Sequence, residues 1–125
     1  MDNVLILDTD LYFANTLKMY FQRSNINCTI CNDGNLAVDY LNNNTYSLVI
    51  CNTQLGHKSG MELSVFLKVN LSDKNTPFIL ITPNNNVAMN SDFQALEPDA
   101  ILHKPISFPA LMNIINEIRN KKVTA

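Results

Sequence analysis

Five short apolar runs are the feature that most constrains how this chain of 125 residues can fold. Each run is continuous rather than alternating with polar residues, which is typical of strands covered on both faces of a parallel sheet. Segments with apolar residues at helical spacing separate the runs, and this alternation predicts an α/β domain. The predicted strands are Val4–Leu7, Cys28–Cys31, Leu48–Cys51, Phe78–Ile81 and Ala100–His103.

Helical spacing is clear in four of the segments that follow these strands. The segment after Phe78–Ile81 is weaker, because it opens with Pro83 and three asparagines that favour turns, so only Val87–Leu96 is expected to be helical there. Ser107 is a candidate N-cap for the last helix, with Pro109 in its first turn. The repeating apolar residues are Leu11, Ala14, Leu17 and Phe21, then Leu36, Ala37, Tyr40 and Leu41, then Leu63, Phe66 and Leu67, and finally Leu111, Ile114, Ile115 and Ile118.

The alternation of strands and helices also predicts the topology. Crossovers between parallel strands are right-handed and helices must cover both faces of the sheet. A doubly wound, five-stranded parallel sheet with the order 2-1-3-4-5 follows, which is a flavodoxin-like three-layer sandwich. We expect one domain over residues 1–121 and a polar tail at 122–125, where a longer protein could continue.

Charge and hydropathy exclude several classes of function. Nine basic and eleven acidic residues give a net charge of −2 without a basic cluster, which argues against nucleic-acid binding. No apolar run approaches the roughly 20 residues that a membrane-spanning helix needs. The N-terminus lacks the basic start and cleavage site of a signal peptide, so we expect a cytoplasmic protein without membrane contact.

The three cysteines, Cys28, Cys31 and Cys51, all lie in predicted strands, which suits reduced core thiols better than a disulfide framework. The stretch "CTIC" has the spacing of a redox motif, but residues three apart on a strand point to opposite faces. A zinc site would need further ligands such as His57 or His103, and neither stands at ligand spacing. We therefore expect no metal and no cofactor.

In an open parallel sheet the functional site lies at the carboxyl ends of the strands, near the switch point between the first and third strands. Polar residues follow four of the predicted strands at this edge. These candidate site residues are Asp8, Thr9 and Asp10 after the first strand, Asn52 after the third, Thr82 after the fourth and Lys104 after the fifth.

These positions and the motifs around them resemble the receiver domain of two-component response regulators, over nearly the whole chain. The motifs that carry the resemblance are "VLILDTD" at 4–10, "LVICNTQLGHKSGMEL" at 48–63, "FILITP" at 78–83 and "DAILHKP" at 99–105. The resemblance implies a flavodoxin-like fold, a role in phosphorelay signalling and a cis peptide bond between Lys104 and Pro105.

The resemblance also implies that Asn52 takes the place of the aspartate that carries the phosphoryl group in receivers. An amide oxygen carries no formal charge and cannot form the acyl phosphate, so Asn52 is not phosphorylatable. Thr9 replaces a second acidic residue, which removes another carboxylate from the family's Mg²⁺ site. We expect Asp8 to contact Lys104 directly or through water, Asn52 to act as a neutral hydrogen-bonding group, and Asp10 to point away from Asp8.

Ile101 takes the switch position, where receivers usually carry an aromatic side chain that rotates inward on activation. A β-branched side chain has little rotamer freedom, so this switch is expected to be frozen or absent, and Thr82 to satisfy the end of its strand. The expected function is an atypical, phosphorylation-independent receiver in two-component signalling that acts through a protein partner. By resemblance, the candidate interaction face consists of Met89, Phe93, Ile101 and Phe108.

Three alternatives stay open. One is a conventional phosphorylated receiver with an unusual pocket, and the second is a flavodoxin-like domain that binds a small molecule. No glycine-rich loop follows the first strand, which disfavours a nucleotide or a flavin as that ligand. The third is a structural domain of a larger protein. Enzymatic activity is not expected, and the identity of the partner and any weak homodimer are left open.

Overall fold

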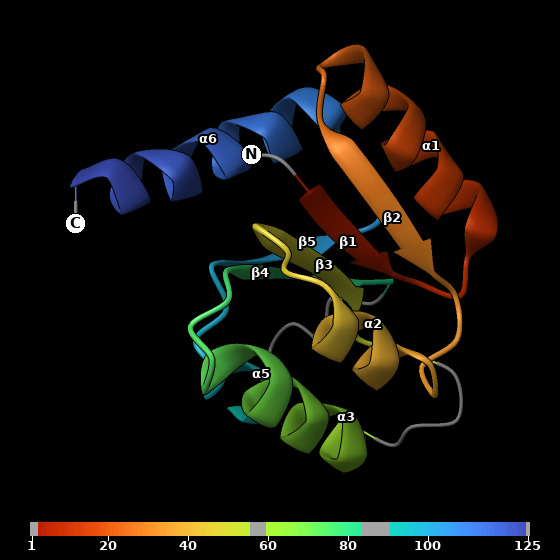
Figure 1. Cartoon of the computed structure of the whole chain (residues 1–125), viewed down its shortest axis with the longest axis vertical. Helices are drawn as coiled ribbons and strands as arrows, with labels where there is room; N and C mark the ends of the chain where they lie inside the picture. The colour runs from red at the N-terminus through yellow and green to blue at the C-terminus, as the bar shows by residue number, and fades with distance from the viewer. Residues whose placement is uncertain (1–2, 56–59, 84–90, 125) are drawn as a thin grey trace.

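The computed structural model describes residues 3–55, 60–83 and 91–124, and these form three layers (Figure 1). A five-stranded parallel sheet with the order β2-β1-β3-β4-β5 forms the middle layer, which confirms the predicted topology. The strands are β1 Asn3–Leu7, β2 Asn27–Cys31, β3 Leu48–Asn52, β4 Phe78–Thr82 and β5 Ala100–His103. The helices are α1 Leu11–Arg23, α2 Ala37–Asn43, α3 Gly60–Leu67, the π-helical turn η1 Lys68–Ser72, α5 Ser91–Gln94 and α6 Phe108–Thr124.

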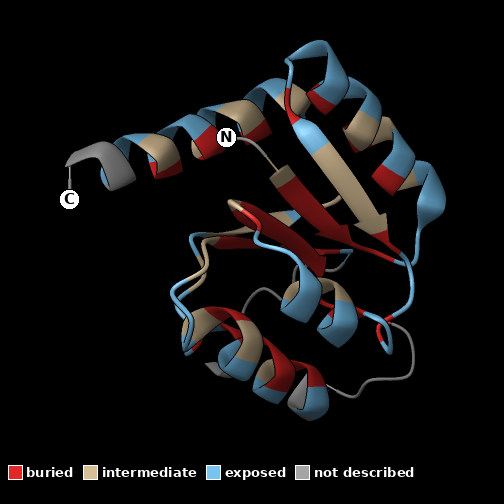
Figure 2. Ribbon diagram, viewed as in Figure 1, coloured by how far each residue is buried: buried red, intermediate tan, exposed pale blue. Residues whose placement is uncertain are grey.

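Two apolar layers hold the sheet between the helices. Leu5 and Leu7 of β1 face the layer under α2, α3 and α5, whereas Val4 and Ile6 face the layer under α1 and α6. This division follows from the two-residue period of a strand, which points successive side chains to opposite faces. Figure 2 shows the buried residues gathered in the central strands and on the inward faces of the helices.

The prediction that all five strands are covered on both faces is correct for the centre of the sheet and wrong for its edges. Every residue of β3 and β4 is buried, and so is β1 after Asn3. In β2 and β5 most residues are only partly buried. These two strands lie at the edges of the sheet, where each has a neighbouring strand on one side only.

Local signals in the sequence explain several of the element boundaries. Ser107 caps α6 as predicted, because its Oγ accepts a hydrogen bond from the backbone N–H of Ala110 at 3.4 Å. The peptide bond between Lys104 and Pro105 is cis, as the resemblance implied. The backbone of α6 continues through residues 122–124 of the expected tail. Of the helix predicted over 87–96, residues 87–90 lie outside the described residues and only Ser91–Gln94 is helical in the rest.

The cysteines are free thiols, as expected of packing residues. Cys28 packs in the layer under α1 and α6, and Cys31 and Cys51 in the opposite layer. Burial raises the pKa of Cys28 to about 11 and also raises the pKa values of the other two thiols. All three are therefore protonated at neutral pH. Within the described ranges, no helix is long and apolar enough to cross a membrane.

Helix α1 offers a direct test of which of its faces stabilises the fold. Phe21 is fully buried, whereas Tyr12 on the same helix is 86% exposed. We expect Phe21→Ala to lower the free energy of unfolding by about 3–5 kcal/mol, because it leaves a cavity in the core. Tyr12→Ala should change it by less than about 0.5 kcal/mol. Urea unfolding followed by circular dichroism checks both values, and similar losses for the two variants would contradict this packing.

Candidate functional site

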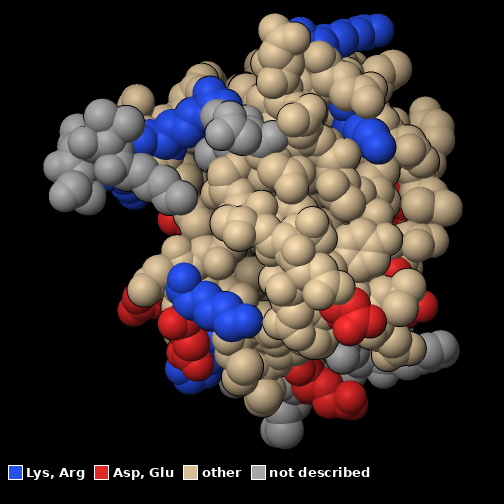
Figure 3. Space-filling model, viewed as in Figure 1, with Lys and Arg blue, Asp and Glu red and all other residues tan. Residues whose placement is uncertain are grey.

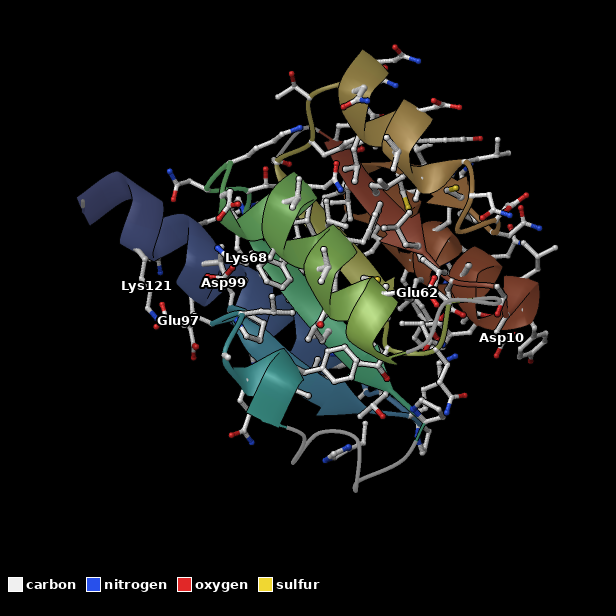
Figure 4. All side chains as sticks on the ribbon, turned by 90° about the horizontal axis from the view of Figure 1, so that it is seen from below. Asp10, Glu62, Lys68, Glu97, Asp99 and Lys121 are labelled. Atoms are coloured by element: carbon white, nitrogen blue, oxygen red, sulfur yellow. The ribbon has the colours of Figure 1, made fainter. Side chains whose placement is uncertain are left out.

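The candidate residues gather where the strands end, because the strands run parallel and their ends are nearly level. Asp8 directly follows β1, Asn52 and Thr82 are the last residues of β3 and β4, and Lys104 directly follows β5. The register pairs Asn52 with Ile81, so that Thr82 lies one position beyond it. Figure 4 shows Asp10 at one end of the molecule, away from the charged residues Lys68, Glu97, Asp99 and Lys121 at the other end.

The carboxylate of Asp8 is the centre of this site, and it is only 1% exposed. Its Oδ1 accepts hydrogen bonds from the side-chain amide of Asn52 at 3.1 Å and from the backbone N–H of Asp10 at 2.9 Å. Its Oδ2 lies 3.2 Å from Nζ of Lys104. Both oxygens of the buried carboxylate therefore have donors, and the contact expected between Asp8 and Lys104 is direct.

The amide of Asn52 is held at both ends. Its nitrogen donates to Asp8, and its Oδ1 accepts a hydrogen bond from the backbone N–H of Gln54 at 2.8 Å. Asn52 is 6% exposed, so water competes little for these hydrogen bonds. An aspartate could accept from Gln54 but could not donate to Asp8. This position therefore uses both the acceptor and the donor of an amide, and the donor is what distinguishes it from a carboxylate.

Asp10 belongs to the same cluster, and the expectation that it points away is wrong. Its Oδ2 lies 3.4 Å from Nζ of Lys104, while its Oδ1 accepts from the backbone N–H of Phe13 and caps α1. The expectation assumed the alternation of a strand, but β1 ends at Leu7 and the chain turns at Asp10 to begin the helix. The hydrogen bond from Phe13 lowers the pKa of Asp10, and Lys104 lowers it further.

Lys104 lies between these two carboxylates with only 18% of its side chain exposed. Its Nζ is also 4.2 Å from the centre of the Phe13 ring, at the distance of a cation–π contact. Phe13 is not among the residues that the sequence predicts for this site. Its position three residues after the helix-capping Asp10 is the signal that could have placed it near the strand ends.

The other candidates lie around this network. Thr9 is exposed, and Thr82 is fully buried with its backbone carbonyl accepting from the N–H of Lys104 at 3.0 Å. Ile101 is partly buried and packs against the core layer under α2, α3 and α5. The side chain of Thr53, next to Asn52, is buried, and its Oγ1 has no hydrogen-bond partner among the residues that the structure describes.

The expected interaction face is not a single surface. Phe93 is 3% exposed and belongs to the core layer that Ile101 also contacts. Phe108 packs on the opposite side of the sheet, where its ring stacks on Tyr20 with the ring centres 4.6 Å apart. Met89 lies outside the described residues. The resemblance placed these residues by position along the chain, and position alone does not show which side chains the core takes up.

The side chains at this site do not suit Mg²⁺, the metal that the resemblance implies. Mg²⁺ prefers an octahedron of oxygen ligands that includes one or two free carboxylates. Here both oxygens of Asp8 are engaged by donors, one of them the positively charged Lys104, and the Asn52 amide presents its nitrogen to the same carboxylate. Among the residues that the structure describes, no three His, Cys, Asp or Glu side chains gather in a way that could hold a metal.

The neighbours Asn52 and Thr53 provide a matched pair of substitutions. Asn52→Asp removes the donor to Asp8 and adds a second carboxylate beside it, so we expect the free energy of unfolding to fall by about 1–3 kcal/mol. Thr53→Val removes a buried hydroxyl that has no partner in the described part of the chain, and we expect stability to be unchanged or to rise by up to about 1 kcal/mol. Thermal melting in a chelator checks both, and an Asn52→Asp variant more stable than the native chain would refute the stabilising role of the hydrogen bond from Asn52 to Asp8.

Solved structures with the same fold include several response regulators. A two-component response regulator of Clostridium difficile has a TM-score of 0.85 at 19% identity, with 98% of each chain covered. A response regulator of Thermotoga maritima, solved in complex with Mg²⁺ and BeF, has a TM-score of 0.79 at 20% identity and covers 94% of this chain and 98% of its own. At this level of identity the likeness shows the fold.

The amino-acid sequence also matches a known protein and the model of a protein family. The probable transcriptional regulator ycf29 of Cyanophora paradoxa is 26% identical over 121 residues, which is 97% of this chain but only 58% of that protein. The chain thus spans little more than half the length of this relative. The model of the response regulator receiver domain matches residues 4–116. The sheet order and the polar residues at the strand ends agree with this match. The chain belongs to the family of response regulator receiver domains.

Proposed function

We propose that this receiver domain is not phosphorylated and that it acts in a two-component pathway through contact with a protein partner. The observation that carries the proposal is the side-chain amide of Asn52 at the end of β3, bonded to the buried carboxylate of Asp8. We take Asn52 to occupy the position of the phosphoacceptor. A receiver domain without an acceptor retains its fold and its surface as the means of signalling.

The chemistry of phosphoryl transfer supports this proposal. The acceptor oxygen must attack phosphorus and then carry it as an acyl phosphate, which requires a carboxylate that is free to react. In Asn52 the nitrogen lone pair is delocalised into the carbonyl, and the oxygen already accepts a hydrogen bond from Gln54. Thr9, which we take to stand at the position of a second acidic residue, carries no charge and does not replace the missing carboxylate. Among the described residues, the pocket therefore offers neither an acceptor carboxylate at position 52 nor a free acidic pair.

The residues of the family's switch support the same conclusion. Thr82 is fully buried at the end of β4, and Ile101 packs against the core as a side chain with little rotamer freedom. In this proposal neither residue responds to a phosphoryl group. The domain then keeps one conformation, and the presence of the partner rather than a covalent change determines the signal.

The distribution of exposed apolar side chains supports a role in protein contact. Four of them lie on helix α1, where Tyr12 is the most exposed. On the face seen in Figure 3, charged side chains lie mainly toward the margin and much of the middle is uncharged. Clusters of exposed apolar residues are more typical of interaction surfaces than of surfaces that face only water. The four residues are Leu11, Tyr12, Met19 and Tyr20.

Phosphoryl transfer from acetyl phosphate tests the proposal. We expect the native chain, incubated with acetyl phosphate and Mg²⁺, to show no mass increase of one phosphoryl group, because it lacks an acceptor carboxylate. Asn52→Asp alone should also stay unmodified, since Thr9 leaves the metal position short of a carboxylate. Intact-protein mass spectrometry gives the answer directly.

The double variant, Thr9→Asp with Asn52→Asp, is the matched control, because it supplies both missing carboxylates on the same scaffold. Phosphorylation of the double variant would show that the reagent works on this fold. An adduct on the native chain that hydroxylamine removes, as it does an acyl phosphate, would refute the proposal.

A further inference from the structure

We propose that a cavity between α1 and the start of α6 binds a small, neutral aromatic molecule that carries a carbonyl oxygen. The start of α6 lies beside α1 (Figure 1), and the cavity between them has a volume of about 600 Å³. Small-molecule sites typically enclose roughly 300–1,000 Å³. Asp8 and Asn52 are not among the described residues that line this cavity, and the inference does not depend on whether Asn52 can be phosphorylated.

Aromatic rings line the cavity from both of its sides. Phe13 and Tyr20 belong to α1, and Phe108 is the first residue of α6. The Phe108 ring stacks on Tyr20 with the ring centres 4.6 Å apart, and it meets the buried Phe21 edge-on at 5.6 Å. These contacts hold the Phe108 ring in place before a ligand arrives, which lowers the entropic cost of placing a flat ring against it.

The cavity reaches the core and is also open to solvent. Leu17 lines it and is only 4% exposed, whereas Tyr20 lines it and is 36% exposed. A ring that enters from the solvent side therefore meets apolar surface down to the core. Removal of that surface from water is favourable roughly in proportion to its area, so an apolar ring gains free energy by entering.

The charges around the cavity favour a neutral ligand. The described residues that line it include no charged side chain. Lys104 lies close by in the sequence, but the carboxylates of Asp8 and Asp10 already pair with its ammonium group. A charged ligand would lose part of its hydration without gaining a counter-charge, which is unfavourable.

Two hydroxyl groups at the cavity determine which polar atom the ligand needs. Thr16 Oγ1 donates its hydrogen to the backbone carbonyl of Tyr12 at 2.8 Å, so it can act only as an acceptor toward a ligand. Ser107 Oγ accepts from the backbone N–H of Ala110, so its own hydrogen can be donated. A carbonyl oxygen at the edge of an aromatic ring is the acceptor that fits the Ser107 hydroxyl.

Coumarin is a suitable probe, because it is flat, neutral and aromatic and carries a carbonyl oxygen. In nuclear magnetic resonance titrations of the native chain, we expect coumarin to shift the backbone amide signals of Thr16, Tyr20 and Ser107. The dissociation constant should be about 1 mM, as is typical of a fragment of this size in a preformed pocket. The signal of Asn52 should stay in place.

Two related compounds separate the features of the ligand. Coumarin-3-carboxylate keeps the ring system and adds a negative charge, and cyclohexanone keeps the carbonyl group and lacks the aromatic ring. We expect each to bind at least about fivefold more weakly than coumarin, the first because the lining offers no counter-charge and the second because it cannot stack.

Tyr20→Ala and Tyr12→Ala form a matched pair of variants on α1. Tyr12 is 86% exposed and is not among the described residues that line the cavity. We expect Tyr20→Ala to weaken coumarin binding by about fivefold, because it removes one aromatic wall, and Tyr12→Ala to leave it unchanged. Circular dichroism before each titration checks that the variants are folded.

Several results would overturn the inference. Equal weakening by the two variants would do so, as would tighter binding of the carboxylate, or shifts confined to Asn52 and its neighbours. No shift with about 10 mM coumarin would also overturn it, and would leave the cavity to a side chain of a protein partner. The titration of the native chain decides even if Tyr20→Ala does not fold. None of these measurements uses acetyl phosphate, so their outcome is separate from that of the phosphoryl-transfer assay.

Discussion

The buried carboxylate of Asp8 is the constraint on which the rest of the candidate site depends. With 1% of its surface exposed it has no access to bulk water, so the protein must supply every partner. Lys104 supplies the charge, and the Asn52 side chain and the Asp10 backbone supply neutral hydrogen bonds. These partners come from the ends of β5 and β3 and from the start of α1, so one charged group holds together the carboxyl edge of the sheet.

The fold that presents this group does not depend on it. Two apolar layers on either side of the sheet contain most of the buried side chains, and the polar site is confined to the ends of the strands. The stability of the fold and the chemistry of the site therefore depend on different residues. This separation gives a physical reason why a chain can keep the receiver architecture while the polar residues at its strand ends vary.

Much of the fold could be predicted because its signals are local. Runs such as Leu48–Cys51 read as buried strands, and the chirality of crossovers then restricts the strand order. The errors arose where the answer depends on packing between distant elements. Phe93 looked like a surface residue and lies in the core, while Asp10 looked as if it turned away and contacts Lys104. The strands at the edges also looked fully buried, because an apolar run does not reveal its place in a sheet.

The amino-acid sequence by itself determined the order of elements and the chemical groups available at the strand ends: one amide, one lysine and two nearby carboxylates. Only the tertiary structure decided which atoms meet. Asn52 lies 44 positions from Asp8, and Lys104 lies 94 positions from Asp10. Contacts at such separations depend on the register between strands and on where the first helix begins. Side-chain patterns along one segment do not encode these relations, because they arise only when the segments pack together.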